Sequence, residues 1–240
     1  MLESQSAVHQ PVSVVNDADP LSTHLSAVPG METLVAGLPL QRRLMRARQY
    51  VFRAGQPRQS LFLIHAGCFK TCVLSEDGRE KITGFRLRGD LLGTDALDMP
   101  SYACDAISLD VGEVWELPVA HLRDSLPDFH ERLTAVLASE IRRDWGWMLA
   151  LGTLSAEQRV IAFLLDLAAR LEALGFSACH LMLRMTRADL GNFLALKLET
   201  VTRALSHLQA LGLIGVERRQ ISIEDPVGLR GLLGAARQVH

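Results

Sequence analysis

The chain has 240 residues, of which 48% are hydrophobic, so it can build a sizeable core without disulfides or metals. Its formal net charge of -2 would by itself argue against a polyanionic partner, but the charge is unevenly spread. Residues 181–240 hold eight Lys and Arg against five Asp and Glu, whereas residues 1–180 hold 17 against 22. The basic C-terminal end is therefore the place to look for a nucleic-acid partner.

The sequence shows no membrane or secretion signal. Its longest uninterrupted apolar run, Trp145 to Leu151, contains a glycine and falls short of the roughly 20 residues that cross a bilayer. Residues 1–20 carry Glu3, Asp17 and Asp19 but no Lys or Arg, so a positively charged signal region is missing. We expect a cytoplasmic protein with no membrane partner.

Four scattered cysteines fit a reducing compartment and make no disulfide framework. Cys68 and Cys72 lie four residues apart on one expected strand, roughly 13 Å from each other, so they cannot chelate one ion. Cys104 could approach either across a sheet, but such cysteines are commonly buried as small hydrophobes. Cys179, beside His180 in the expected interdomain segment, is a candidate thiol switch. We expect no metal site, and the redox activity of the four thiols stays open.

The first half of the chain predicts an arm followed by a β-roll. Residues 1–30 are rich in Ser, Val, Asp and Pro without periodicity, which is typical of a mobile arm. Residues 31–126 contain short β-branched and aromatic runs separated by turn glycines, the pattern of an antiparallel roll or jelly roll. Gly78 should supply the positive φ of a tight hairpin. The expected strands are Tyr50–Phe52, Leu61–Ile64, Phe69–Leu74, Ile82–Leu87, Tyr102–Leu109 and Glu113–Leu117.

A long helix is expected at residues 127–152. Pro127 and Asp128 are favourable in a first helical turn, and about 25 residues follow without proline. A rod of roughly 37 Å is longer than one small roll needs as a cover. One apolar set could face the roll, namely Leu133, Val136 and Trp147. The other forms a heptad a and d seam that predicts a homodimer and includes one charged residue: Leu137, Ile141, Asp144, Met148 and Leu151.

Residues 153–240 predict a winged helix-turn-helix domain. A helix at about Ala156–Leu174 starts it, and Thr186 caps a short helix that ends near Leu194. A turn at 195–197 leads into a further helix, which Gly212 ends after about Leu211. Two short strands behind it, Ile214–Val216 and Ile221–Ile223, form the wing. The overall prediction is an α+β protein.

The last long helix presents candidate base-reading residues. Leu198, Val201, Leu205, Leu208 and Leu211 form its inward stripe, which leaves four polar side chains outside: Glu199, Thr202, Arg203 and Ser206. Arg can donate twice to guanine and Glu can accept from cytosine in the major groove. The alternative is a solvated face with an i, i+4 Glu199/Arg203 pair. The capped helix before it and the basic hairpin after it favour DNA binding, with phosphate contacts at Arg187, Lys197, Arg218 and Arg219.

With these motifs, residues 45–225 resemble the CRP/FNR transcription regulators. The resemblance rests on Phe52-Arg53-Ala54-Gly55, Asp77-Gly78-Arg79-Glu80-Lys81-Ile82-Thr83-Gly84-Phe85, Gly89-Asp90-Leu91-Leu92-Gly93, Met185-Thr186-Arg187-Ala188-Asp189-Leu190-Gly191-Asn192 and Glu199-Thr200-Val201-Thr202-Arg203.

The resemblance implies a sensor roll, a dimer helix and a winged-helix domain that binds double-stranded DNA at inverted repeats with TTGAT-like half-sites. It also implies base contacts from Glu199, Thr202 and Arg203, and an Asp at the position of Asp144 that keeps unsignalled relatives monomeric. A hairpin that contacts RNA polymerase would comprise Ser75, Glu76, Asp77, Gly78, Arg79, Glu80 and Lys81. Two departures are Lys197, where Ser or Thr usually caps the reading helix, and Ala195, where glycine is common.

No cofactor is predicted. Cyclic-nucleotide members of the family need a Glu after the Gly-Asp-Leu turn and an Arg further on, whereas here Gly93 precedes Thr94 and Asp95. Members with a [4Fe-4S] cluster use N-terminal cysteines, but residues 1–67 contain none, and Trp115 stands at the late-strand cysteine position. Haem ligation stays open, with candidate histidines His9, His24, His65 and His121.

The sequence does not predict an enzyme, because it contains no nucleophile elbow, zinc-protease or phosphate-loop motif. The alternative function is a small-ligand-binding regulatory module that acts on a partner protein without binding DNA. The signal, the target genes and the choice between activation and repression stay open.

Overall fold

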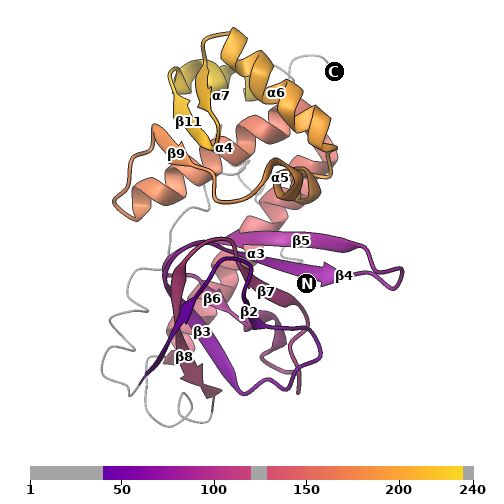
Figure 1. Cartoon of the computed structure of the whole chain (residues 1–240), viewed down its shortest axis with the longest axis vertical. Coiled ribbons are helices and arrows are strands. Elements are labelled where there is room, and N and C mark those ends of the chain that lie inside the picture. The colour runs from indigo at the N-terminus through magenta and orange to yellow at the C-terminus, as the bar shows by residue number, and fades with distance from the viewer. Residues whose placement is uncertain (1–39, 120–128, 235–240) are drawn as a thin grey trace, which may run out of the picture.

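The structure is a computed structural model that describes residues 40–119 and 129–234. The expected arm at 1–30 and the expected helix start at Pro127 and Asp128 lie outside these residues. Figure 1 shows a β-roll at one end of the molecule and a mixed helix and strand domain at the other, with helix α3 (Phe129–Thr153) running between them. Within the described ranges, no helix combines the length and apolar character that crossing a membrane requires.

The roll consists of two four-stranded antiparallel sheets, with strand orders β1-β8-β3-β6 and β2-β7-β4-β5. Gly78, at a φ of 78°, closes the β4–β5 hairpin, in which the Gly78 amide donates to the Ser75 carbonyl. The elements are β1 (Gln41–Met45), β2 (Tyr50–Phe52), β3 (Ser60–Ala66), β4 (Phe69–Leu74), β5 (Glu80–Arg86), β6 (Leu91–Leu92), the short 3-10 helix η2 (Thr94–Ala96), β7 (Asp105–Ser108) and β8 (Gly112–Pro118).

Helix α3 covers one face of the roll, as its second apolar set predicts. Val136 and Leu133 pack against a cluster that includes Leu63, Trp115 and Leu117. Trp147, which we expected on the same face, instead packs against two rings of the other domain, with centroid distances of 4.8 Å to Phe193 and 6.3 Å to Phe163. The expectation for Trp147 holds in part, because Trp147 lies at the junction of the two domains and lines one small cavity with Thr83 and Phe85 of the roll as well as with Phe163 and Phe193.

The second domain is a winged helix-turn-helix. Its elements are α4 (Ala156–Ala173), β9 (His180–Met182), α5 (Arg187–Leu194), α6 (Leu198–Ala210), β10 (Ile214–Glu217), β11 (Gln220–Ile223) and α7 (Pro226–Gly234). The wing sheet has three strands, in the order β10-β11-β9, rather than the two expected. His180 therefore belongs to this sheet, not to an interdomain segment.

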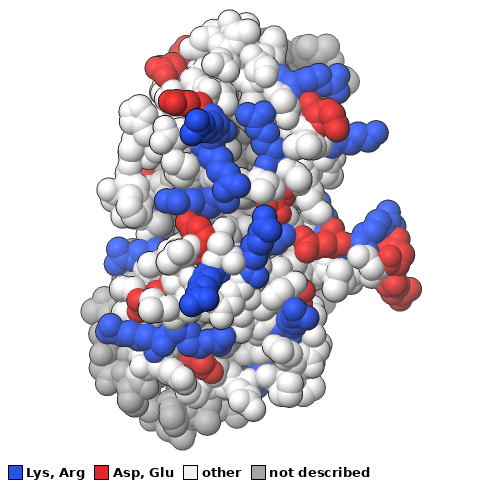
Figure 2. All heavy atoms as spheres, viewed as in Figure 1, with Lys and Arg blue, Asp and Glu red and all other residues white. Residues whose placement is uncertain are grey.

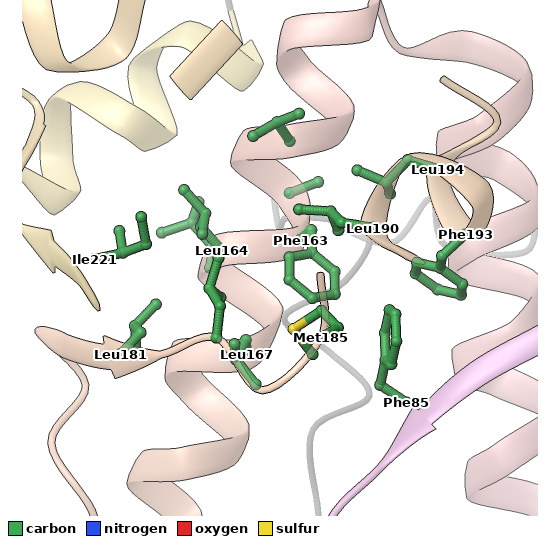
Figure 3. Close-up of a cluster of buried hydrophobic side chains, with 14 of the residues drawn as sticks. Phe85, Phe163, Leu164, Leu167, Leu181, Met185, Leu190, Phe193, Leu194 and Ile221 are labelled. Atoms are coloured by element: carbon green, nitrogen blue, oxygen red, sulfur yellow. The ribbon is translucent and has the colours of Figure 1, made fainter. Parts of the chain in front are cut away.

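The two domains share one apolar core. Phe85 of β5 meets Phe193 of α5 at 5.3 Å and Phe163 of α4 at 5.7 Å between ring centroids. Figure 3 shows these three rings facing one another, beside Met185 and Leu190. The winged-helix domain is thus packed on the roll through buried side chains rather than attached by a linker alone.

Candidate nucleic-acid interface

Helix α5 begins with a capping box that fixes its direction. The Thr186 hydroxyl accepts a hydrogen bond from the Asp189 amide at 3.0 Å, and the Asp189 carboxylate accepts one from the Thr186 amide at 3.0 Å. Burial by itself would raise the pKa of the Asp189 carboxyl, but bonds from Thr186 and Lys70 outweigh it and hold the pKa below its ordinary value.

The turn between α5 and α6 is tight despite lacking the usual glycine. Ala195 adopts a left-handed conformation with a φ of 55°, which is strained for any residue that has a Cβ. Gly191 permits the close approach of the turn, because a Cβ there would lie 2.7 Å from the Leu196 carbonyl oxygen. The helix-turn-helix expected at these positions is confirmed.

The outward face of α6 is open. Val201, Leu205 and Leu208 are buried, as predicted, whereas Leu198 and Leu211 at the helix ends are exposed. Glu199, Arg203 and Ser206 are exposed, and Thr202 is half-buried with its hydroxyl donating to the Leu198 carbonyl at 3.0 Å.

The alternative interpretation of this face required an ion pair. Glu199 and Arg203 both lie in the described part of the chain, and no ion pair joins them. The Lys197 side chain makes no capping bond at the start of α6, in keeping with the departure noted in the sequence. The side chains predicted to read bases are therefore presented to solvent, not engaged with one another.

Three of the four predicted phosphate contacts border one groove. Arg187, Arg218 and Arg219 line a groove of about 360 Å³ whose floor includes Leu205 and Ile221. Arg218 stands at the β10–β11 turn with a φ of 55°. Lys197 is not part of this groove and lies at the N-terminal end of α6. Figure 2 shows Lys and Arg side chains over this face of both the winged-helix domain and the roll, with acidic side chains among them.

A carboxylate of α3 lies beside the turn after Gly93, where the cyclic-nucleotide members of the resembled family bind phosphate. Glu140 of α3 accepts a hydrogen bond from the Thr94 hydroxyl at 3.0 Å and one from the Arg86 guanidinium at 2.9 Å. An anionic phosphate at Thr94 would meet this negative charge, which is held in place by a largely buried ion pair. The residues present do not fit a cyclic nucleotide.

The residues present also do not fit the family's iron-sulfur cluster. Trp115 is buried in β8 and stacks on His65 with 4.3 Å between ring centroids. No group of three or more His, Cys, Asp or Glu suited to a metal ion occurs in the part of the chain that the structure describes. His9, His24 and His121 lie outside that part.

Three of the four thiols are poor nucleophiles. Cys68, Cys72 and Cys104 are buried, and burial raises the pKa of all three, to about 12 for Cys68 and Cys72. These thiols stay protonated at neutral pH and behave as small hydrophobes. Cys179 is exposed.

Helix α3 carries an uncovered apolar face. Ile141, Trp145, Met148 and Leu149 are all exposed, and their spacing of i, i+4, i+7 and i+8 places them on one side of the helix. Asp144, also exposed, interrupts this face at i+3. Leu137 and Leu151 of the predicted seam are half-buried, while Trp145 and Leu149 were missed because they fall outside a strict a and d register.

The β4–β5 hairpin is divided between two environments. Its tip, Ser75–Arg79, is exposed, and within it an ion pair joins Arg79 to Asp77 at 2.6 Å. Figure 2 shows this hairpin protruding from the molecule with both acidic and basic side chains. Glu80 and Lys81, by contrast, contact groups at the domain junction. Glu80 remains exposed despite its bond to Lys70, whereas Lys81 is half-buried.

Comparison with known proteins agrees with this architecture. A family model described as a Crp-like helix-turn-helix domain matches residues 158–232, and a cyclic nucleotide-binding domain model matches residues 42–127. The anaerobic regulatory protein of Pasteurella multocida is 37% identical over 200 residues, which are 82% of this chain and 73% of that protein. The transcriptional activator protein Anr of Pseudomonas protegens is 35% identical over 90% of this chain and 88% of its own length.

A solved structure shows the same fold. FixK2 from Bradyrhizobium japonicum superposes with a TM-score of 0.74 at 30% sequence identity, covering 81% of this chain and 98% of that one. The roll, the long helix and the winged-helix domain with its open reading face define a DNA-binding transcription regulator. The chain belongs to the CRP/FNR family of these regulators. Membership favours DNA binding over the alternative of a regulatory module without a DNA role.

Proposed function

We propose that this protein binds DNA as a homodimer, at inverted repeats with TTGAT-like half-sites. The observation that supports this most directly is the open face of α6, where Glu199, Thr202 and Arg203 are presented together with no ion pair between the two charged residues. Arginine and glutamate in this position can read guanine and cytosine edges in the major groove. Ser206 extends the same face by one turn.

The arginines around the groove would hold the DNA backbone on either side of the reading helix. Arg187 lies in the first turn of α5, whereas Arg218 and Arg219 lie on the wing, so their charges reach the duplex from two elements. Lys197 adds a cation at the start of α6. Such contacts position a protein on DNA without specifying the sequence.

The dimer would form through the uncovered face of α3. Trp145 and Met148 are 62% and 67% exposed in the single chain, a large apolar area for a helix in water. Pairing with the same face of a second copy would bury it. The two winged-helix domains would then address two half-sites related by the same two-fold axis.

We further propose that DNA binding requires neither a cyclic nucleotide nor an iron-sulfur cluster. The Thr94–Glu140–Arg86 arrangement and the buried Trp115 oppose these two groups. The protein would act inside the cytoplasm and would not be an enzyme, and the exposed hairpin tip would contact RNA polymerase.

A gel shift tests the proposal. Protein purified in air, without reconstitution and without cyclic nucleotide, should bind an inverted repeat of TTGAT half-sites more tightly than a duplex with both half-sites scrambled. Equal affinity for the two duplexes would overturn the sequence assignment. Binding that appears only after anaerobic iron and sulfide loading, or only with cyclic AMP, would overturn the cofactor-independent part alone.

A further inference from the structure

Strand β5 has an open edge that helix α5 occupies. β5 is the last strand of the sheet β2-β7-β4-β5, so its outer backbone groups have no strand partner. The Ile82 amide donates to the Asn192 side-chain oxygen at 2.7 Å, and the Asn192 side-chain nitrogen donates to the Glu80 carbonyl at 2.8 Å. One carboxamide therefore makes the pair of bonds that a neighbouring strand would make.

Two lysines of the roll hold the two ends of α5. Lys81 Nζ donates to the backbone carbonyls of Asn192 and Phe193, at the helix end where carbonyls lack partners within the helix. Lys70 Nζ lies 3.0 Å from the Asp189 carboxylate and 2.7 Å from that of Glu80. The Lys70 and Asp189 side chains are both largely buried. We call these contacts of Lys70, Glu80, Lys81, Ile82, Asp189 and Asn192 the α5 clamp.

The α5 clamp leaves the reading face of α6 uncovered. Every contact that the clamp makes with the winged-helix domain is made with α5, whereas Glu199, Arg203 and Ser206 remain exposed on α6. The clamp therefore does not hide the DNA-binding surface. What it fixes is the angle at which that surface stands on the roll.

The covalent connection between the domains does not by itself fix the angle between the winged-helix domain and the roll. Only residues 154 and 155 separate α3 from α4, so the orientation of the winged-helix domain depends on the side-chain contacts between the domains, and loosening those contacts would let it rotate about a few backbone bonds. In a dimer joined through α3, such a rotation would change the distance and twist between the two reading helices.

We propose that Asn192 and Lys81 are positioning residues, and that the α5 clamp sets which spacing between two half-sites the dimer accepts. This inference rests on the proposed homodimer and its inverted repeat. Each base pair added between half-sites moves one of them by about 3.4 Å and turns it by roughly 35°. A rigid dimer tolerates one spacing, whereas a dimer with loosened winged-helix domains tolerates several.

The experiment measures affinity of the full chain for a series of inverted repeats that differ only in spacer length, and for a duplex with a single half-site. Wild type should prefer one spacer. Asn192→Ala and Lys81→Met should each reduce the ratio between the best and the next spacer by about fivefold or more, the usual scale of coupling within a protein. Their affinity for the single half-site should stay that of wild type.

Arg79→Ala is the matched control, because Arg79 lies on the same hairpin, is 84% exposed and pairs with Asp77 rather than with α5. It should leave the spacer ratio unchanged. Amide hydrogen exchange should show lost protection at Ile82 in Asn192→Ala, since its partner is gone.

Two results would overturn the clamp while leaving the proposed function intact. One is an unchanged spacer ratio in both variants, even with a lower melting temperature, which would mean that the contacts only stabilise the fold. The other is an equal loss on the single half-site, which would mean that the variants damage the DNA-binding domain itself. Wild-type protein that binds all these duplexes as it binds random DNA would instead refute the proposed function, and the clamp with it.

Discussion

Two cations near the start of α6 should contribute differently to DNA binding. Arg203 is exposed one turn into the helix, beside Thr202, where its guanidinium can reach a base edge. Lys197 precedes the first turn, and in the proposed complex it would contact the DNA phosphates. A bidentate contact to guanine is worth about 1 to 3 kcal/mol of discrimination, whereas a phosphate contact affects all sequences alike.

We therefore predict that Arg203→Ala costs about 1 to 3 kcal/mol on the cognate site and relaxes the preference at one guanine. Lys197→Ala should weaken cognate and random duplexes equally and lower the salt dependence of binding. Titrations on both duplexes at several salt concentrations measure this. If Arg203→Ala lost the same affinity on both, Arg203 would be a phosphate contact instead.

Residue roles could be predicted from the sequence where they depend on neighbouring residues in the chain. Thr186 and Asp189 form a capping box within four residues, so the start of α5 could be predicted from the sequence. Leu198 and Leu211 were predicted to be buried because they continue the 3.6-residue stripe. They lie at the two ends of α6, and both are exposed.

Elements were predictable where they are long or strongly patterned. Strands β2 and β4 have the predicted bounds, because each is a compact apolar run next to a turn. β1 was missed because Arg42 and Arg43 interrupt it, and β6 and β9 were missed because two or three residues show no alternation. These short strands complete sheets whose partners lie far away in the chain.

The hairpin tip should separate transcription from DNA affinity. Glu76 and Asp77 are exposed at the tip of the β4–β5 hairpin, which projects from the side of the roll in Figure 1. Charge reversal at Glu76 or Asp77 should therefore lower transcription in a reconstituted assay with polymerase while leaving the gel-shift affinity unchanged. Loss of DNA binding in these variants would contradict the prediction that the hairpin tip acts in transcription and not in DNA binding.

The ion pair between the β5–β6 turn and α4 should make the free energy of unfolding depend on pH in the acid range. Asp90 lies 2.7 Å from Arg170 and accepts a bond from the Leu87 amide at 2.9 Å. Burial by itself would raise the pKa of the Asp90 carboxyl, but Arg170, Arg143 and Arg86 outweigh it and hold the pKa below its ordinary value. Such a carboxylate stabilises the fold above that ordinary value, near 3.8, and the contribution is lost as the pH falls through the lower folded pKa.

Asp90→Asn should therefore lower the free energy of unfolding near neutral pH, and the difference from wild type should shrink between about pH 5 and about pH 2. Denaturant titrations at a series of pH values measure the difference. Asp98→Asn is the control, because Asp98 is exposed and should show no such trend. A difference that is constant across the acid range would show that Asp90 acts through packing rather than charge.

At the scale of the whole molecule, the sequence predicts the domains but not their junction. The roll, long helix and winged helix each follow from local patterns. Asn192 and Ile82 are separated by 110 residues, and nothing in either motif indicates that an asparagine side chain would complete a sheet edge. The exposure of Trp145 is a similar case, since two neighbouring tryptophans on α3 turn to opposite sides, with Trp147 buried and Trp145 in solvent.

Asp144 lies within the apolar face that the proposed dimer would bury. In the single chain it is exposed between Ile141 and Trp145, so its charge is solvated. In a parallel dimer the two copies of Asp144 would lie near the same axis, where loss of water and like-charge repulsion both oppose ionisation. Dimerisation should then be weaker than the neighbouring apolar residues would allow.

Replacing the carboxylate removes both penalties while keeping the helix, because alanine is a strong helix former. We predict that Asp144→Ala tightens the dimer by more than about 1 kcal/mol, in line with the replacement of a buried charge by an apolar group. Sedimentation equilibrium over a range of concentrations measures the monomer–dimer constant, and DNA affinity at low protein concentration should rise with it. Arg142→Ala, an exposed change beside the same face, is the control and should alter the constant little. An unchanged constant in Asp144→Ala would place Asp144 outside the seam, on a helix rotated so that Trp145 and Leu149 form its centre.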